Sequence, residues 1–406
     1  MMRSSLLFAF VLVPAAALGL HTALLSSSSS ASAQSVMPAA PSARACDSRC
    51  GAWMDANLRI DQVQMVGTAD SYKQRPNKAL MGLIRMGGKK DADALDYGEP
   101  AIPAQLDGDV RALSFDVAFD PKGGTYKTPA GANMAMDLLP ADYTAAMSKP
   151  GFKVIHVLDI DYGSSCLALS DCLKQVAGWS RAHPRHLPIV ITLRTNDEKT
   201  PMPGATKPMP CDTAALDALD AEIRTAFNAN EIITPDQVQG GHATLREAVL
   251  AHAWPTVGAA RGKVIFVLDS SDKARAYQGA RKSLEGRSMF VAADAASPVA
   301  AFLSLPDPLK DRARIEKAVA DGFMVTTRAD ADTREARLFN LKRRDAAFAS
   351  GAQVVQTDFA TADPAIGPYR VTLADNPDAM CGKQLGSEHC VRMESASLRT
   401  ANAALR

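Results

Sequence analysis

The feature that most constrains this chain is the alternation of short apolar runs with amphipathic stretches over residues 58–373. Several of the runs are almost continuous in apolar side chains, which is typical of parallel strands that are buried on both faces. We expect eight strands, at Gln62–Val66, Ala112–Phe119, Lys153–Leu158, Ile189–Leu193, Val264–Leu268, Met289–Ala292, Phe323–Thr327 and Gln353–Gln356.

The stretches between these runs have the spacing of amphipathic helices. The clearest is Thr213–Phe227, in which apolar residues recur every three or four positions behind a capping Asp212 or Thr213. Gly322 and Gly351 stand where helix C-terminal caps belong. Helices are also expected at Leu167–Ala182, Ala243–Ala253, Asp311–Ala320 and Asp332–Ala349.

Eight strands alternating with helices predict an α/β fold, a single-domain (β/α)8 barrel of the TIM type. The alternative is a doubly wound open sheet, although the glycine-rich fingerprints of nucleotide-binding sheets are absent from the sequence. We divide the chain into a signal peptide (1–33), a loose lead-in (34–57), the barrel (58–373) and a tail (374–406), with both terminal extensions held by disulfides.

The amino terminus has the pattern of an export signal. A positive Arg3 precedes an apolar run over residues 6–20, and the small residues Ala31-Ser32-Ala33 form a cleavage site. The run is short for a membrane span, which needs about 20 residues, so a retained anchor is the alternative. We therefore expect a secreted or periplasmic protein.

The seven cysteines fit an oxidising compartment. Three pairs are close in sequence, and pairing within them leaves Cys211 free. Zinc binding is the alternative, but no histidine joins the cysteines at ligand spacing. The candidate disulfides are Cys46 with Cys50, Cys166 with Cys172, and Cys381 with Cys390.

Charge excludes some partners. The 45 Lys and Arg balance 44 Asp and Glu, so the sequence offers no electrostatic basis for binding nucleic acid. The apolar segment 79–86, followed by Lys89-Lys90, is either a lid that contacts a membrane surface or a helix packed on the barrel.

Function in such a barrel belongs at the carboxyl ends of the strands. His156 there is a candidate acid or base, or a structural residue, and Asp70 and Asp116 could hold Ca²⁺. Arg194 and Arg328 suit a phosphate. Simpler roles are open for the remaining aspartates, as loop caps or helix starts: Asp159, Asp161, Asp330 and Asp332.

Together these segments resemble the bacterial calcium-dependent phosphoinositide phospholipase C-like proteins. The resemblance rests on residues 66–72 (VGTADSY), 110–116, 151–162, 240–249, 327–333, 343–347 and 350–353. It implies a TIM-like barrel that cleaves phosphodiesters, in which an inositol hydroxyl attacks phosphorus, one histidine is the base, a second assists, and Ca²⁺ lowers the hydroxyl pKa.

The chain departs from the family pattern G-T-H-N-S-Y. Ala69 stands at the first histidine and Asp70 at the asparagine, while His156 keeps the second histidine. Ser114 replaces one calcium-binding carboxylate and Arg194 another, and Asn196 replaces a lysine. We expect calcium to be lost, with the Arg194 guanidinium beside Asp70 and Asp116 in its place, and Asp70 as the only base that the motif offers.

Three functions follow from this pattern. The first is a protein with impaired or lost catalysis that still binds a phosphoinositide or another phosphorylated head group through His156, Arg194 and Arg328. The second is an active, metal-independent phosphodiesterase with Arg194 in place of Ca²⁺. The third is a non-catalytic extracytoplasmic scaffold.

Overall fold

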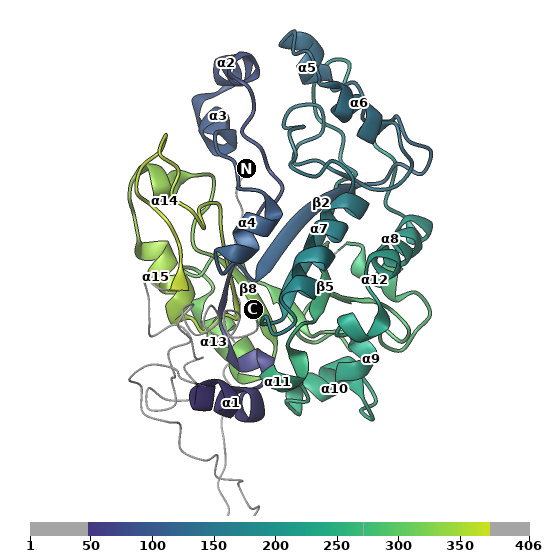
Figure 1. Ribbon diagram of the computed structural model, residues 1–406, viewed down its shortest axis with the longest axis vertical. Helices are drawn as coiled ribbons and strands as arrows, with labels where there is room; N and C mark the ends of the chain where they lie inside the picture. The colour runs from purple at the N-terminus through teal and green to yellow at the C-terminus, as the bar shows by residue number, and fades with distance from the viewer. Residues whose placement is uncertain (1–47, 271, 374–406) are drawn as a thin grey trace, which may run out of the picture. The chain divides into compact units, whose positions relative to one another are not determined.

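Eight parallel strands form a nearly closed barrel in the computed structural model, which describes residues 48–270 and 272–373 (Figure 1). Hydrogen bonds join them in the order β6-β5-β4-β2-β1-β9-β8-β7, and a parallel bridge between Ala292 and Phe302 links the two end strands. The predicted (β/α)8 barrel is confirmed. The strands are β1 Met65–Thr68, β2 Ala112–Ala118, β4 Ile189–Thr195, β5 Val264–Leu268, β6 Met289–Val291, β7 Phe302–Ser304, β8 Met324–Arg328 and β9 Val354–Thr357.

One strand assignment made from the sequence is wrong, and one strand was missed. The run at 153–158 is not a barrel strand, because only β3 (Lys153–Val154) is extended and it pairs antiparallel with the end of β2. The apolar residues after it, Ile155 and Leu158, pack instead against Tyr126 and Tyr143 above the barrel. The missing eighth strand is β7, whose three residues are too short to give a periodic signal.

The helices agree better with the sequence pattern. Asp212 accepts a hydrogen bond from the Ala215 N–H at the start of α8, and Gly322 and Gly351 have positive φ. The helix expected at 332–349 is broken by a turn at Phe339, where φ is 48°. The α-helices are α1 Ser48–Asn57, α2 Lys78–Gly87, α3 Lys89–Leu95, α4 Ile102–Asp107, α5 Ala130–Met134, α6 Ala141–Met147, α7 Leu169–Ala182, α8 Thr213–Ala226, α9 Pro235–Gln239, α10 Leu245–Leu250, α11 Val257–Ala260, α12 Ala274–Gln278, α13 Arg312–Ala320, α14 Arg334–Arg337 and α15 Lys342–Ala349.

One glycine sets the spacing of the strands below the mouth. Gly67 on β1 pairs with Ala112 on β2 and with Gln356 on β9. Because Gly67 has no side chain, Gln356 reaches over β1 and donates a hydrogen bond of 2.7 Å to the Ser114 hydroxyl on β2. Ser114 and Gln356 therefore face the barrel interior. Asp116 and Asp358, each two positions further along the chain, face the same way.

The segment expected to be a loose lead-in contains helix α1. Met54 and Leu58 pack with Val63, Leu187 and Val257. The α1 carboxylate Asp55 also pairs with two arginines, Arg185 and Arg261. Residues 48–57 are thus part of the folded unit that contains the barrel.

The cysteines are partly described. The predicted Cys166–Cys172 disulfide is present, and Cys211 is free and buried. Residues 1–33, Cys46, Cys381, Cys390 and the tail after 373 lie outside the described residues, and the side chain of Cys50 is not described. In the described part of the chain, every helix is too short or too polar to cross a bilayer.

The close approach at Gly67 predicts a large cost for a single methyl group. A Cβ at this position would lie 2.6 Å from Ala112 Cβ and 2.9 Å from the Ala112 carbonyl oxygen, so Gly67→Ala should destabilise the fold by about 1–3 kcal/mol in urea unfolding. Gly82→Ala in α2 is the matched control, since nothing lies within 4 Å of its Cβ and it should stabilise by roughly 0.5–1 kcal/mol. Equal stability of the two variants would contradict the strand spacing.

Candidate active site

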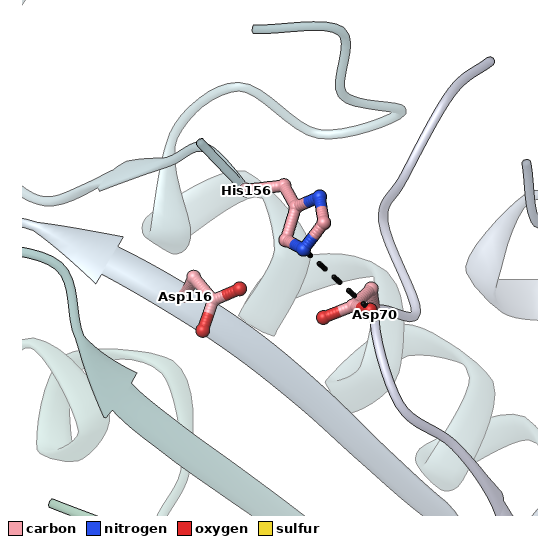
Figure 2. Close-up of side chains that lie close together, drawn as sticks. All are labelled: Asp70, Asp116 and His156. Carbon is pink, nitrogen blue, oxygen red and sulfur yellow. Dashed lines mark ion pairs between the residues drawn. The ribbon is translucent and has the colours of Figure 1, made fainter. Parts of the chain in front are cut away.

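The predicted site residues meet at the mouth of the barrel. Asp116 and Arg194 stand side by side at the ends of β2 and β4, and Asp70 follows β1. His156 comes from the loop after β3 and points toward the two carboxylates (Figure 2). Arg328 ends β8 and contributes to the electrostatic field at Asp70.

Arg194 lies between the two aspartates, as the sequence predicted. Its Nε donates to Asp116 Oδ1 at 2.6 Å, and its Nη2 donates to Asp116 Oδ2 at 3.1 Å. The same Nη2 contacts Asp70 Oδ1 and donates to the Ala69 carbonyl at 2.9 Å. One guanidinium therefore ties the ends of β1, β2 and β4 together.

Two tyrosines that the sequence analysis did not single out complete the carboxylate contacts. Tyr72 donates to Asp116 Oδ2 at 2.8 Å, and Tyr97 donates to Asp70 Oδ2 at 2.6 Å. Both rings are buried. Although burial favours the neutral acid, His156, Arg194 and Arg328 hold the pKa of Asp70 well below its usual value. Tyr72 lies inside the family motif at residues 66–72. No motif in the sequence contains Tyr97.

These contacts test whether calcium fits the site. Single ligand atoms of Asp70, Asp116 and His156 lie within 4.8 Å of one another, a spacing that a metal ion could use. All four carboxylate oxygens, however, already accept hydrogen bonds from Arg194, Tyr72 or Tyr97. Ca²⁺ needs 6–8 oxygen ligands, and a permanent cation already stands between these two carboxylates. The residues present do not fit Ca²⁺.

His156 is held in one orientation by a buried ion pair. Its Nδ1 hydrogen-bonds Asp161 Oδ2 at 2.8 Å, and that oxygen also lies 3.1 Å from the Nζ of the fully buried Lys73. Its Nε2 lies 3.9 Å from Asp70 Oδ2. Burial opposes the charged imidazole, but Asp70, Asp161 and Asp116 together raise the pKa of His156 to about 9. This raised pKa favours the charged imidazole of His156 at neutral pH.

The backbone around His156 is fixed by polar side chains. Asn196 donates from Nδ2 to the carbonyls of Ile155 and His156 at 2.7 and 3.2 Å. Asp159 caps the loop, as the simpler interpretation expected, by accepting from the backbone N–H groups of Ala130 and Thr206. Asp161 is not a loop cap, since it binds His156 and Lys73.

A second acidic group lies where β8 and β9 end. Arg328 donates to Asp358 Oδ1, and the Asp358 N–H donates to Asp330 Oδ1 at 2.8 Å. Burial and the neighbouring Asp358 raise the pKa of Asp330 to about 7. Burial and the same carboxylates raise the pKa of Glu99, whose Oε1 is buried without a hydrogen-bond partner among the described residues. No motif or periodic pattern in the sequence indicated Asp358 or Glu99.

At Ala69 and Ser114, two positions where the chain departs from the family pattern, the polar groups form hydrogen bonds. Ala69 is fully buried, and its N–H donates to the Thr357 carbonyl at 3.0 Å. Ser114 accepts from Gln356, and its main-chain N–H donates to the Ser71 hydroxyl at 2.8 Å. The Arg194 guanidinium is therefore the central cation of the hydrogen-bond network that joins Asp70 and Asp116 at the mouth.

A histidine, two arginines and several carboxylates thus meet at the mouth of a (β/α)8 barrel. A family model described as phosphoinositide phospholipase C, Ca²⁺-dependent, matches residues 58–382, which is more than half of the chain. The chain belongs to this family. No curated protein gives a significant match.

Solved structures of bacterial phospholipases C resemble the chain at low identity. A calcium-dependent phosphoinositol-specific phospholipase C from Pseudomonas sp. is 17% identical, with 78% of this chain and 96% of that one covered and a TM-score of 0.46. The Ca²⁺-dependent enzyme from Streptomyces antibioticus is 17% identical over 74% and 95%, with a TM-score of 0.45. The phosphatidylinositol-specific enzyme from Listeria monocytogenes is 12% identical over 76% and 93%, with a TM-score of 0.42.

Arg194→Ala should destabilise the fold and open a cation site. Removing one partner of a buried ion pair costs about 3–5 kcal/mol, and because 26% of the Arg194 side chain is exposed we expect about 3 kcal/mol in urea unfolding. Ca²⁺ should then raise the Tm of the variant and leave that of the wild type unchanged.

The matched control is Arg314→Ala, which removes an exposed pair with Asp311 and should cost less than about 1 kcal/mol. A Ca²⁺-dependent Tm of the wild-type protein would show that the guanidinium does not exclude the ion.

Proposed function

We propose that this protein binds the phosphodiester head group of an inositol lipid, or a related phosphorylated head group, without calcium, and that its cleavage activity is impaired relative to calcium-dependent members of its family. The observation that carries the proposal is the Arg194 guanidinium between Asp70 and Asp116. It supplies positive charge where the family resemblance implies a metal ion.

Three groups are available to a phosphate. The side chains of Arg194 and Arg328 are 26% and 23% exposed, and Nη1 of each donates no hydrogen bond to any residue that the structure describes. His156, with 22% of its side chain exposed, supplies an N–H from Nε2 when charged. Guanidinium and imidazolium donors make charge-assisted hydrogen bonds to phosphate oxygens, which supports binding of one phosphodiester.

Impaired cleavage follows from position 69. An alanine methyl group stands where the family pattern has the histidine that acts as general base, and loss of such a base lowers the rate by about 10²–10⁴-fold. Asp70, the base that the motif offers, is a weak proton acceptor because its pKa is held low.

A slow, metal-independent phosphodiesterase is the second candidate. A charged His156 can protonate a leaving oxygen, and the nearby Arg194 can stabilise negative charge that develops on the phosphate. In this reaction a hydroxyl of the head group attacks the neighbouring phosphorus, and the bond to the lipid alcohol breaks.

We also propose that the protein acts outside the cytoplasm. The Cys166–Cys172 disulfide supports this location, because disulfides persist in oxidising compartments, and so does the export pattern of residues 1–33.

The test of binding is a thermal-shift titration with inositol 1-phosphate in excess EGTA. We expect a rise in Tm, which Arg328→Ala abolishes and the surface variant Arg314→Ala retains. Absence of any shift in the wild type would favour the scaffold function.

The test of cleavage is turnover of phosphatidylinositol in Ca²⁺ and in EGTA. We expect a rate at least about 100-fold below that of a calcium-dependent relative and equal in the two buffers. Ala69→His combined with Arg194→Glu should raise the rate in Ca²⁺ only. Calcium-dependent turnover by the wild type at the usual family rate would overturn the proposal.

A lipid ligand requires the barrel mouth to reach a membrane surface. Nine large apolar side chains are exposed in the described residues, and three of them, Met134, Met136 and Leu138, lie in the segment between β2 and β4 that also carries His156. In α2 itself Leu80 and Met81 are buried, so that helix packs on the protein, and Met86 is its exposed large apolar side chain. The other exposed side chains are Met209, Leu250, Leu309, Leu338 and Phe339.

We expect replacement of these side chains to weaken membrane binding. Met134→Ser, Met136→Ser and Leu138→Ser together remove the most exposed cluster and should lower the fraction that sediments with phosphatidylcholine vesicles containing phosphatidylinositol. The control is Leu250→Ser at the carboxyl end of α10, which should sediment as the wild type does. Equal sedimentation of all three proteins would contradict membrane contact through the mouth.

A further inference from the structure

We propose that Asp358, at the end of β9, is the general base for phosphodiester cleavage in this protein and takes the place of the imidazole missing at Ala69. The inference rests on the second candidate function, slow metal-independent cleavage. It names a catalytic residue that lies outside the motif from which the family's base histidine comes.

Strand register places Asp358 beside Ala69. Strands β1 and β9 pair in parallel from Met65 with Val354 to Thr68 with Thr357. The ladder continues one step, because the Ala69 N–H donates to the Thr357 carbonyl at 3.0 Å. The Met65 N–H donates to the Gln353 carbonyl in the same way, four residues earlier on each strand. The residue that faces Ala69 across the ladder is therefore Asp358.

The alternation of side chains directs Asp358 toward the mouth. Gln356, two residues earlier, points into the barrel and donates to Ser114 on β2. Side chains two positions apart on a strand share a face, so Asp358 lies on the interior side. This orientation agrees with its ion pair to Arg328, whose own strand partner is Gln356. The neighbour of this carboxylate at the end of β1 is the methyl group of the fully buried Ala69 and not a larger side chain.

One carboxylate oxygen of Asp358 is available to accept a proton. Arg328 binds Oδ1, and no residue that the structure describes donates a hydrogen bond to Oδ2. Asp70 differs, because Arg194 and Tyr97 occupy both of its oxygens. Of these two carboxylates at the end of β1 and β9, only Asp358 has an acceptor site that the protein itself leaves unused.

The opposite pKa shifts of Asp358 and Asp70 also favour Asp358 as the base. Burial raises the pKa of Asp358 above its ordinary value, partly offset by Arg328, whereas the pKa of Asp70 is lowered. A base of higher pKa accepts a proton more readily from an alcohol. The charged or titratable groups that face Asp358 are Arg328 and Asp330 from β8 and its following loop, Asp70 after β1, Tyr97 and Glu99 after α3, and His156 after β3.

The reaction then balances without a metal. Asp358 Oδ2 takes the proton of the head-group hydroxyl, and the hydroxyl oxygen forms a bond to the adjacent phosphorus. The bond from phosphorus to the lipid oxygen breaks, and that oxygen takes the proton from His156 Nε2. The products are a cyclic phosphodiester and a free alcohol, with Asp358 neutral and His156 uncharged until solvent exchange returns the proton.

The experiment measures phosphatidylinositol turnover in EGTA by the full chain. Asp358→Asn keeps the size of the side chain and should lower kcat by about 10²–10⁴-fold. The acidic limb of the wild-type pH–rate profile should lie above the ordinary pKa of aspartate and should vanish in the variant. Sodium formate should restore part of the turnover of Asp358→Ala in a saturable way, and sodium chloride should not, because formate supplies a carboxylate base.

Two outcomes distinguish failure of the Asp358 assignment from failure of the proposed cleavage function. If the wild type turns over in EGTA and Asp358→Asn retains more than a tenth of its kcat, Asp358 is not the base although the protein is a phosphodiesterase. If the folded wild type shows no turnover in EGTA but inositol 1-phosphate raises its Tm, the cleavage function is wrong and the assignment of Asp358 falls with it.

Discussion

The mouth of this barrel depends on one ion pair network, in which Arg194 joins Asp70 and Asp116. Two buried carboxylates side by side repel each other, and each loses hydration on burial. The guanidinium offsets both costs with a planar set of donors that reaches three strand ends at once. Because Tyr72 and Tyr97 occupy remaining carboxylate oxygens, the arrangement is complete without an added ion.

The rest of the site follows from this network. With Asp70 held as an anion, the nearby imidazole of His156 is stabilised in its charged form, and Asp161 with Lys73 fixes the ring. The base and the acid that a phosphodiesterase needs therefore cannot both come from the family's histidine positions. In the cleavage that we propose, Asp358 at the end of β9 is the base, which links the loss of one imidazole to a carboxylate on a neighbouring strand.

The sequence predicted the barrel because long buried strands such as β4 and β5 carry a strong apolar signal. It could not show β7, which has three residues, or that the apolar residues after Lys153 pack in a loop cluster. The Arg194 contacts were predictable from the family resemblance, because Arg194 stands where the family pattern has a calcium-binding carboxylate. The pairing of β2 with β4 was not, because a strand at 153–158 was expected between them. Asp358, Tyr97 and Glu99 were not, because their positions depend on strand register and on loops between α3 and α4, which leave no periodic pattern in the chain.

The disulfide between Cys166 and Cys172 has a consequence for ligand binding. It anchors the far end of the loop that carries His156 and Asp161 to helix α7, while β3 holds the near end against β2. A loop fixed at both ends has few conformations to lose when a ligand arrives, so the imidazole is already in position and the entropic cost of association is small. A preorganised loop of this kind favours tight binding of one ligand over adaptation to many different ligands.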